Sequence, residues 1–479
     1  MSFFIAGEQK IRPGTYIRYW NRGSRPIAGV DDGVCAAVFR SNWGPVDEPT
    51  IIENFEDIAR LYGEGGTNGR TAVPFEQFRG GARRVVAMRL GMGGTRGSYG
   101  IMDASNTEAM RLVLLHPGSK EFMLTIRPTL EDPDQSEMLL TDGTMLLERY
   151  AFSTGDGANQ AANLLAALRA VQSNYFSWAE ITASNEPLAI IDQARFTQGT
   201  DPTITVAAYS RAFEKLEAER WNVLSIDAND DAVHAMTQMF LNRVYQNGKF
   251  VMGVIGEPAT GPDAVPFATR LIHASAYNDY QIVYVGNGWA DITGTAHEGW
   301  LAAARVAGEI AGTPSNEATT RLAVRNAVGL TEKLRNWQIE RALTSGMFVF
   351  SRSSANTVWI EQGINTLVLP RSNQDIGWKK IKRVKVRFEL FDRLIRTVDP
   401  LIGRLNNDDD GRMTIVQLGN GVCNAMVSEQ KLLPGAHVEL DPDNPPQGDS
   451  AWFRVFADDI DALEKIYHAF GFRFAPDEA

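Results

Sequence analysis

Apolar positions at both ends of the chain follow the pattern of β-strands that have no local partner. A turn signal, Pro13-Gly14, precedes a β-branched and aromatic run, and three phenylalanines near the C-terminus alternate along one strand face. Chain ends are usually polar unless something holds them in place. We predict β-augmentation, in which each arm completes a sheet in another molecule; folding of both arms onto their own domain is the open alternative. The predicted exchange residues are Thr15, Tyr16, Ile17, Arg18, Tyr19, Trp20, Phe470, Phe472 and Phe474.

Strand and helix patterns alternate regularly between residues 205 and 311. Short apolar runs at 223–226, 250–255 and 281–285 indicate strands, apolar residues recur at helical spacing between them, and a small-residue helix is expected at 296–311. Repeated strand–helix units predict a parallel sheet with right-handed crossovers. Runs at 34–39 and 83–90 predict further strands of the same domain.

The segments on either side of this α/β block have different patterns. Residues 98–204 contain short apolar runs separated by Pro, Gly and Asp, with one helix at 158–173, which predicts an inserted α+β domain of antiparallel strands. From residue 346 the pattern is again α+β. Strands are predicted there at 347–351, 358–361, 364–369, 436–440 and 451–456, and helices at 384–398, 414–431 and 458–469.

These patterns predict a multidomain protein with both α/β and α+β domains. The predicted parts are an N-terminal arm (1–25), a discontinuous central α/β domain (26–97 and 205–345), an inserted domain that we expect to face outward (98–204), a C-terminal domain (346–469) and a C-terminal arm (470–479).

Composition narrows the classes of function. The 479 residues are 44% hydrophobic and 22% charged, as in soluble globular proteins, and the net charge of −11 argues against general binding to nucleic acid or anionic membranes. The two cysteines, Cys35 and Cys423, form no framework and suit a reducing compartment. The first residues lack a basic signal-peptide region and no apolar run reaches about 20 residues, so we expect folding in a cytoplasm.

Motifs for phosphate or metal binding are incomplete. The glycine-rich loops at 63–69 and 91–97 do not match G-x-G-x-x-G, so we expect ordinary turns. His297-Glu298 lacks a second histidine four residues later, and the other histidines are scattered. We therefore expect neither a metal nor a cofactor.

An α/β hydrolase is the alternative function. Ligands of open parallel sheets bind beyond the carboxyl ends of the strands, where this chain carries Asp227, Glu257 and Asn287. Asp227 with His234 and a distant Ser315 could form a triad, but no G-x-S-x-G motif occurs. Capping of the following helix is the more plausible role for the acidic run. That run comprises Asp227, Asn229, Asp230 and Asp231.

Basic residues concentrate between Trp378 and Arg404. This segment carries nine basic and three acidic residues, a net +6, which leaves −17 on the rest of the chain. Such segregation can steer an acidic partner and set its register; a solvated helix face bridged to acidic neighbours is the commoner outcome. Nucleic-acid binding is weakly indicated, since Trp378 is the one flanking aromatic residue.

Three segments outside residues 98–204 follow one another along the chain in a characteristic order. They are the arm Ile11–Tyr16 with the strand Val34–Val38, the run Gly346–Phe350 with Val358–Leu367, and the carboxyl segment from Lys382 to Tyr467. In this order the chain resembles the contractile tail sheath proteins of bacteriophages and phage-tail-like particles.

The resemblance implies a fold, partners and a mechanism. The central domain would have a subtilisin-like α/β topology without proteolytic function, and the terminal arms would cross to neighbouring subunits. Hexameric rings would stack around a tail tube and contract to drive the tube through a cell envelope. Baseplate and tail terminator proteins would be further partners; assembly would take place in the host bacterial cytoplasm, and the product would be part of the virion. The C-terminal domain would face the tube, and from charge we expect its contact residues among Lys379, Lys380, Lys382, Arg383, Lys385, Arg387, Arg393 and Arg396.

Overall fold

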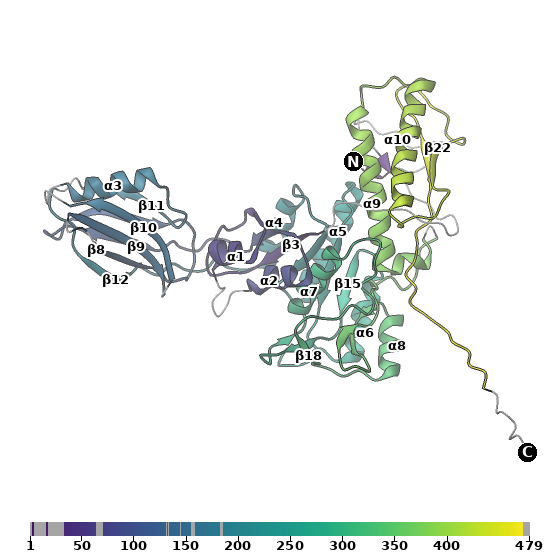
Figure 1. The fold of residues 1–479 in the computed structure, drawn as a ribbon, viewed down its shortest axis with the longest axis horizontal. Helices are drawn as coiled ribbons and strands as arrows, with labels where there is room; N and C mark the ends of the chain where they lie inside the picture. The colour runs from purple at the N-terminus through teal and green to yellow at the C-terminus, as the bar shows by residue number, and fades with distance from the viewer. Residues whose placement is uncertain are drawn as a thin grey trace, which may run out of the picture.

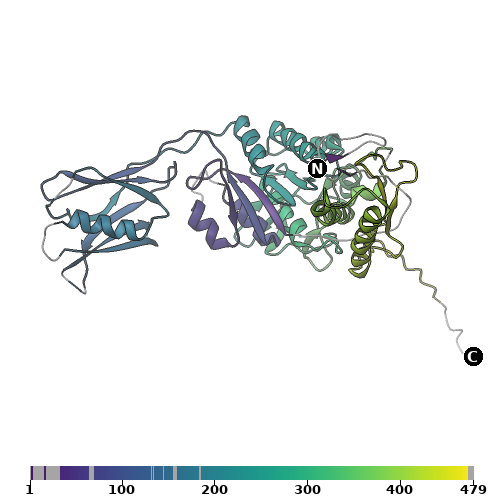
Figure 2. The same ribbon diagram turned by 90° about the horizontal axis from the view of Figure 1, so that it is seen from above.

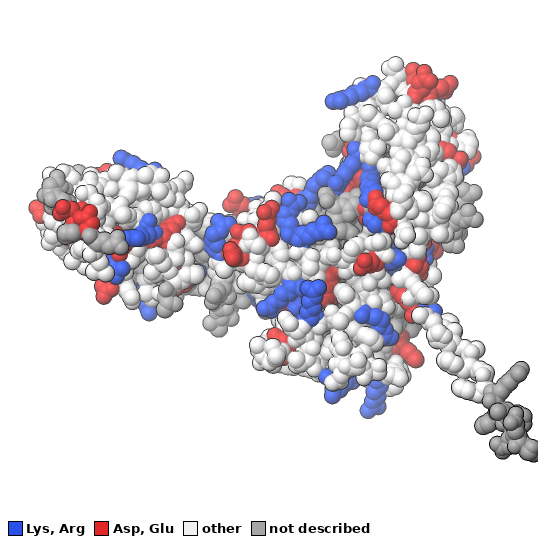
Figure 3. Space-filling view, viewed as in Figure 1, with Lys and Arg blue, Asp and Glu red and all other residues white. Residues whose placement is uncertain are grey.

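The computed structural model contains three lobes and an extended C-terminal segment (Figures 1 and 2). A narrow waist joins the inserted lobe to the rest of the molecule (Figure 3). The structure describes residues 2–3, 16–17, 33–63, 70–130, 132, 134–143, 145–154, 159–182, 185–372 and 374–472.

The central lobe is built on a seven-stranded sheet of order β19-β15-β14-β13-β3-β5-β4. All neighbouring strands are parallel except β4, which is antiparallel to β5. The predicted parallel sheet is therefore confirmed. Its strands are β3 (Val34–Phe39), β4 (Pro49–Ile52), β5 (Arg84–Arg89), β13 (Val223–Ile226), β14 (Met252–Gly256), β15 (Ile282–Val285) and β19 (Met347–Phe348).

Helices cover both faces of this sheet because its strands are apolar on both sides. Cys35 and Phe39 belong to one buried core, while Ala36 and Val38 belong to the other. The first core includes residues of α1 (Phe55–Tyr62), α2 (Ala72–Gly80) and α7 (Trp300–Gly312). The second includes residues of α4 (Val206–Leu216), α5 (Asp231–Gln246), α6 (Phe267–Tyr277) and α8 (Asn336–Thr344).

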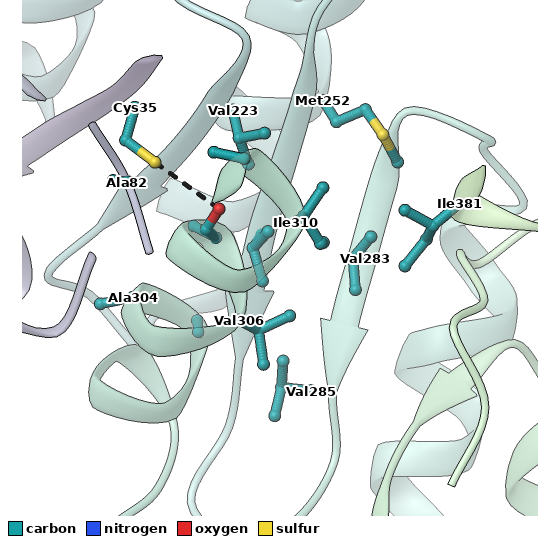
Figure 4. Packing of buried hydrophobic residues seen from close by; sticks show 14 of the residues in the cluster. Cys35, Ala82, Val223, Met252, Val283, Val285, Ala304, Val306, Ile310 and Ile381 are labelled. Atoms are coloured by element: carbon teal, nitrogen blue, oxygen red, sulfur yellow. Dashed lines mark hydrogen bonds between the residues drawn. The ribbon is translucent and has the colours of Figure 1, made fainter. Parts of the chain in front are cut away.

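Helix α7 lies close to α2 and to the sheet. A Cβ atom on Gly308 would lie 2.0 Å from the backbone oxygen of Gln77, so only glycine permits this approach. Val306 and Ile310 point from α7 toward the sheet, and the Cys35 thiol contacts the Ala307 carbonyl at 3.5 Å (Figure 4). The helix begins later than predicted, because residues 296–297 form β17 instead.

Strand β17 belongs to a small three-stranded sheet of order β17-β16-β18. Its members are β16 (Trp289–Asp291), β17 (Ala296–His297) and β18 (Ala327–Leu330). The antiparallel pairing of Trp289 with His297 brings their rings to a 5.0 Å stacked contact.

Glu309 is a buried carboxyl group on α7 whose ionisation is expected to make the stability of the protein depend on pH. Burial raises its pKa to about 8, although the charge of Arg305 acts in the opposite direction. The folded state therefore retains a proton that the unfolded chain releases near pH 4.5, and the stabilisation is lost as the pH rises from about 4.5 to about 8. We expect Glu309→Gln to match the parent below pH 4.5 and to melt at higher temperature than the parent above pH 8. Thermal unfolding at pH 4, 6 and 9 checks this, and an offset that does not vary with pH would contradict it.

The inserted lobe consists of two antiparallel sheets and one helix, as predicted. The strand orders are β10-β9-β8-β12 and β11-β7-β6, and all pairings are antiparallel. Its elements are β6 (Ser98–Met102), β7 (Glu108–Leu114), β8 (Met123–Pro128), β9 (Gln135–Asp142), β10 (Met145–Ser153), α3 (Gln160–Ala170), β11 (Phe176–Glu180) and β12 (Ile191–Arg195).

The glycine-rich loop at 91–97 is one of two linkers to the inserted lobe. It pairs antiparallel with the returning linker through the bridges Met92–Thr203 and Thr95–Thr200. A Cβ atom on Gly97 would lie 2.4 Å from the Thr197 carbonyl oxygen. These glycines therefore permit close contact between the linkers. The loop at 63–69 lies outside the described residues apart from Gly63, which ends α1.

The C-terminal lobe contains two long helices and two strand pairs. Its elements are β20 (Phe350–Arg352), β21 (Val358–Ile360), the 3₁₀ turns η1 (Ile376–Lys379) and η2 (Asp399–Leu401), α9 (Ile381–Val398), α10 (Asp409–Ser428), β22 (His437–Leu440) and β23 (Phe453–Phe456). The predicted strand at 347–351 is divided, because Met347 and Phe348 join the central sheet. The predicted strand at 364–369 is wrong: Ile364 makes a single bridge to Lys380.

The predicted helix at 458–469 is also wrong. Residues 457–472 contain no helix, and both ribbon views show the segment leaving the body (Figures 1 and 2). Its apolar stripe has no surface to cover, since Leu463 and Tyr467 are 82% and 88% exposed. An isolated helix of about 12 residues is marginal in water without such packing.

The described part of the N-terminal arm is a pair of short strands. Strand β1 (Ser2–Phe3) pairs in parallel with β2 (Tyr16–Ile17). The other predicted exchange residues in this arm, Thr15, Arg18, Tyr19 and Trp20, lie outside the described residues, as does Phe474. Strand exchange between subunits stays a prediction.

Among the described residues, no helix combines the length and the apolar character that crossing a bilayer requires.

Candidate functional site on helix α9 and the C-terminal segment

Helix α9 has an apolar stripe and basic residues on its remaining surface. Val384, Phe388 and Phe391 recur at helical spacing and are buried. Phe388 and Phe391 contact Phe250 at ring-centroid distances of 5.9 and 5.1 Å. Because this stripe fixes the helix against the central lobe, it also fixes where the basic side chains lie.

Asp459 is the first anchor of the C-terminal segment (residues 457–472). Its carboxylate accepts hydrogen bonds from Arg383, with one at 2.5 Å, and from Arg387 at 3.1 Å. Burial alone would raise the pKa of Asp459, but the hydrogen bond from Arg383 and the charges of both arginines outweigh it, so the pKa is lowered. Arg387 also pairs with Asp375 at 3.1 Å and lies 4.5 Å above the Trp378 ring.

A second anchor lies five residues further along. Lys380 pairs with Asp461 at 2.7 Å and with Glu464 at 3.1 Å. Glu464 also accepts hydrogen bonds from Thr320 and Gln362, both at 2.7 Å. Although burial would raise the pKa of Glu464, these donors and Lys380 lower it. The segment is thus held to the body by charge and hydrogen bonds as far as Glu464.

Beyond Glu464 the segment presents apolar side chains to solvent. Ile466, Tyr467, Phe470 and Phe472 are 64%, 88%, 80% and 89% exposed. Burying a large apolar side chain is worth about 1.5–3 kcal/mol. Exposed groups of this size, gathered on one segment, are typical of a binding surface.

The remaining predicted tube-contact residues have partners within the chain or are buried. Lys379 donates to the Thr344 carbonyl, Lys382 is 7% exposed, Lys385 donates to the Ile310 carbonyl, Arg393 pairs with Glu389 and Glu429, and Arg396 pairs with Asp392. For Arg393 and Arg396 the geometry matches a helix face bridged to acidic neighbours, whereas Lys379 and Lys385 bind backbone carbonyl groups. On the face drawn in Figure 3, Lys and Arg gather over the central lobe beside acidic residues. Contact of α9 with a tube stays a prediction.

The three candidate triad residues have separate partners. Asp227 accepts hydrogen bonds from Arg40 at 2.8 Å and from the Tyr209 hydroxyl at 2.5 Å. His234 bonds the Ala228 carbonyl at 2.9 Å. Ser315 donates to Glu389 on α9 at 2.7 Å. The three are not assembled as a triad, and the hydrolase alternative is not supported.

Only one residue of the acidic run caps the following helix through its side chain. Asp230 accepts from the backbone N–H groups of Ala232 and Val233 at 2.9 and 3.2 Å. Asn229 instead accepts from the backbone N–H of Trp300, at the start of α7. The capping prediction is therefore wrong for Asp227 and Asn229, because their side chains reach other elements.

Sequence reasoning missed the acidic anchors of the C-terminal segment. Three acidic residues of the segment pair with basic residues at the start of α9: Asp459, Asp461 and Glu464 with Lys380, Arg383 and Arg387. Both the acidic and the basic residues recur at intervals of two to four positions in the sequence. The sequence feature that could have revealed these anchors is the excess of basic residues on α9, because basic side chains packed against a protein surface are commonly paired with acidic residues.

Comparison with known proteins supports the fold and, within the matched region, part of the predicted resemblance. Residues 203–366 match the family model described as the phage tail sheath protein central domain. This part of the chain is therefore similar to the central domain of phage tail sheath proteins. Solved sheath tail proteins are similar over nearly their whole length. That from Desulfitobacterium hafniense has 19% identity and a TM-score of 0.70, covering 94% of this chain and 98% of its own. That from Listeria innocua has 17% identity and a TM-score of 0.69, covering 90% and 96%.

Two further relatives extend the comparison. The helical sheath of the anti-feeding prophage in its contracted state has 10% identity and a TM-score of 0.53, covering 97% of this chain and 99% of that chain. The uncharacterized protein YqbK of Bacillus subtilis (strain 168) is 24% identical over 418 residues, covering 83% of this chain and 82% of YqbK.

Proposed function

We propose that this protein is a subunit of a contractile tail sheath, which polymerises around an inner tail tube and contracts to drive the tube through a cell envelope. The observation that carries the proposal is the C-terminal segment. Anchored through Asp459 and Glu464, it presents exposed aromatic residues, including Phe470 and Phe472, away from the body. A tethered apolar strand is suited to completing a sheet in a neighbouring subunit.

The proposed mechanism is mechanical. Hexameric rings stack in a long metastable state, and a trigger at the baseplate releases a compact state that buries more surface. The exchanged arms keep subunits connected while they rotate as near-rigid bodies. No ATP is needed, because the energy is stored during assembly.

The proposal also includes the partners of the protein, its location and the topology of its central domain. The C-terminal domain faces the tube, the baseplate and tail terminator proteins bind the ends, and the inserted domain faces outward. Assembly takes place in the host cytoplasm and the product is part of a virion or phage-tail-like particle. The central domain has a subtilisin-like topology, an assignment supported by its largely parallel sheet with helices on both faces.

Removal of either arm is expected to abolish polymerisation. Negative-stain microscopy of the full-length protein should show long hollow tubes, whereas variants lacking residues 1–20 or 470–479 should remain folded monomers by light scattering and circular dichroism. Ile190→Ser is a matched control, because Ile190 is 73% exposed on the inserted lobe. Tubes formed by the truncated variants as readily as by the parent would refute strand exchange through these arms.

A further inference from the structure

Three side chains from separate elements converge at the carboxyl edge of the central sheet. Glu257 directly follows β14, Asp231 is the first residue of α5, and His273 lies on α6. Their ligand atoms all lie within 4.8 Å of one another. The Nδ1 atom of His273 is 2.8 and 3.1 Å from the Glu257 oxygens and 3.7 Å from Oδ1 of Asp231.

These separations suit a shared metal ion. Ligands at about 2.0–2.2 Å from a tetrahedral zinc ion lie roughly 3.3 Å from one another, and the observed distances lie on both sides of that value. One imidazole nitrogen with two carboxylate oxygens is a donor set that transition metals bind.

Burial differs among the three residues in a way that suits metal entry. Glu257 is 1% exposed, whereas the Asp231 and His273 side chains are 65% and 28% exposed. The site is therefore closed on the protein side and open to solvent on the other. An open position of this kind leaves room for a water molecule as fourth ligand.

Two neighbouring groups support the site. The Tyr284 hydroxyl donates to Glu257 and so orients its carboxylate. His234, three residues after Asp231, is 0% exposed, and its Nε2 bonds a carbonyl oxygen, so Nδ1 carries a lone pair. That Nδ1 has no hydrogen-bond partner among the residues described. Burial lowers the pKa of His234.

We propose that Asp231, Glu257 and His273 bind a divalent transition-metal ion of the zinc type. The ion would fasten the start of α5 and helix α6 to the end of β14. Short-motif searches miss this set because its members are 26 and 16 residues apart and meet only through the parallel sheet. The site is independent of the proposed mechanical function, so failure of either leaves the other intact.

Zinc titration of the full-length, chelator-stripped protein tests the proposal. We expect one Zn²⁺ per chain by calorimetry and a raised melting temperature with Zn²⁺. His273→Ala and Asp231→Asn should each weaken binding at least tenfold. Both residues are partly exposed, so these variants are expected to fold.

The control is His437→Ala, because His437 also faces a carboxylate, Glu439, at 3.7 Å but is not part of a three-ligand set. It should bind zinc as the parent does. Absence of binding to the parent, or equal binding by the His273→Ala and His437→Ala variants, would overturn the proposal. Substitution by Co²⁺ adds a direct readout, since a visible absorption band should appear in the parent and disappear in His273→Ala.

Discussion

Replacing Asp459 by alanine is expected to release the C-terminal segment and to lower the free energy of unfolding of the C-terminal lobe by about 3 kcal/mol. The Asp459 side chain is 7% exposed, and its partners Arg383 and Arg387 are 14% and 15% exposed. Removing the acid leaves two poorly solvated guanidinium groups, for which Asp375 is the remaining ion-pair partner within 4.0 Å among the described residues. Urea unfolding followed by tryptophan fluorescence measures the loss, and limited proteolysis should then cut between residues 457 and 464.

Asp461→Ala is the matched control for this experiment. Asp461 belongs to the same segment and pairs with Lys380, but its side chain is 39% exposed, and exposed ion pairs contribute about 0–1 kcal/mol. We expect little change in stability or proteolysis. If the two variants behave alike, the buried network around Asp459 does not anchor the segment.

The central sheet was predictable because its signal is local and redundant. Runs such as 223–226 are apolar on both faces, and the helices between them carry stripes at regular spacing, so propensity, pattern and packing agree. The boundary at 296–300 was missed because Ala296 and His297 pair with residues of β16, a contact that a helical pattern does not reveal.

The C-terminal segment was not predictable for a related reason. Ile460, Leu463, Ile466 and Tyr467 have helical spacing, but amphipathic spacing stabilises a helix only where a surface receives the apolar face. Instead, the basic residues Lys380 and Arg383, at the start of α9, bind the acidic side chains of the segment. These ion pairs hold the backbone extended as far as Glu464. The stripe then remains exposed, which is consistent with a partner outside the chain.

The candidate metal ligands could not be predicted from the sequence either. The sequence indicates that Glu257 lies at a strand end, yet it cannot show which residues of α5 and α6 come near it. That depends on crossover geometry in the folded sheet. Ligand sets assembled across several elements become visible only when the fold is known.

Trp43→Ala is expected to uncouple the inserted lobe from the central lobe. Trp43 follows β3 in the central lobe, but its side chain is 1% exposed and belongs to the core of the inserted lobe. Its ring lies 4.7 Å from Phe122, 5.2 Å from His116 and 6.5 Å from Tyr175. Truncating a buried tryptophan costs about 3–5 kcal/mol, through lost contacts and the cavity that remains. Hydrogen exchange should therefore accelerate in the inserted lobe, and its thermal transition should separate from that of the central sheet.

Trp337→Ala provides the comparison, because Trp337 is 53% exposed on α8 and makes one edge contact with Phe267 at 6.5 Å. Its loss should leave both thermal transitions in place. Unchanged hydrogen exchange in the inserted lobe of Trp43→Ala would mean that the two lobes are held together by other contacts, such as those of the buried Arg89 with the Gly44 and Pro117 carbonyls at 2.7 and 2.8 Å. If exchange does accelerate, a single aromatic side chain transmits the position of the central sheet to the inserted lobe, and the proposed rigid-body rotation of the subunit would depend on it.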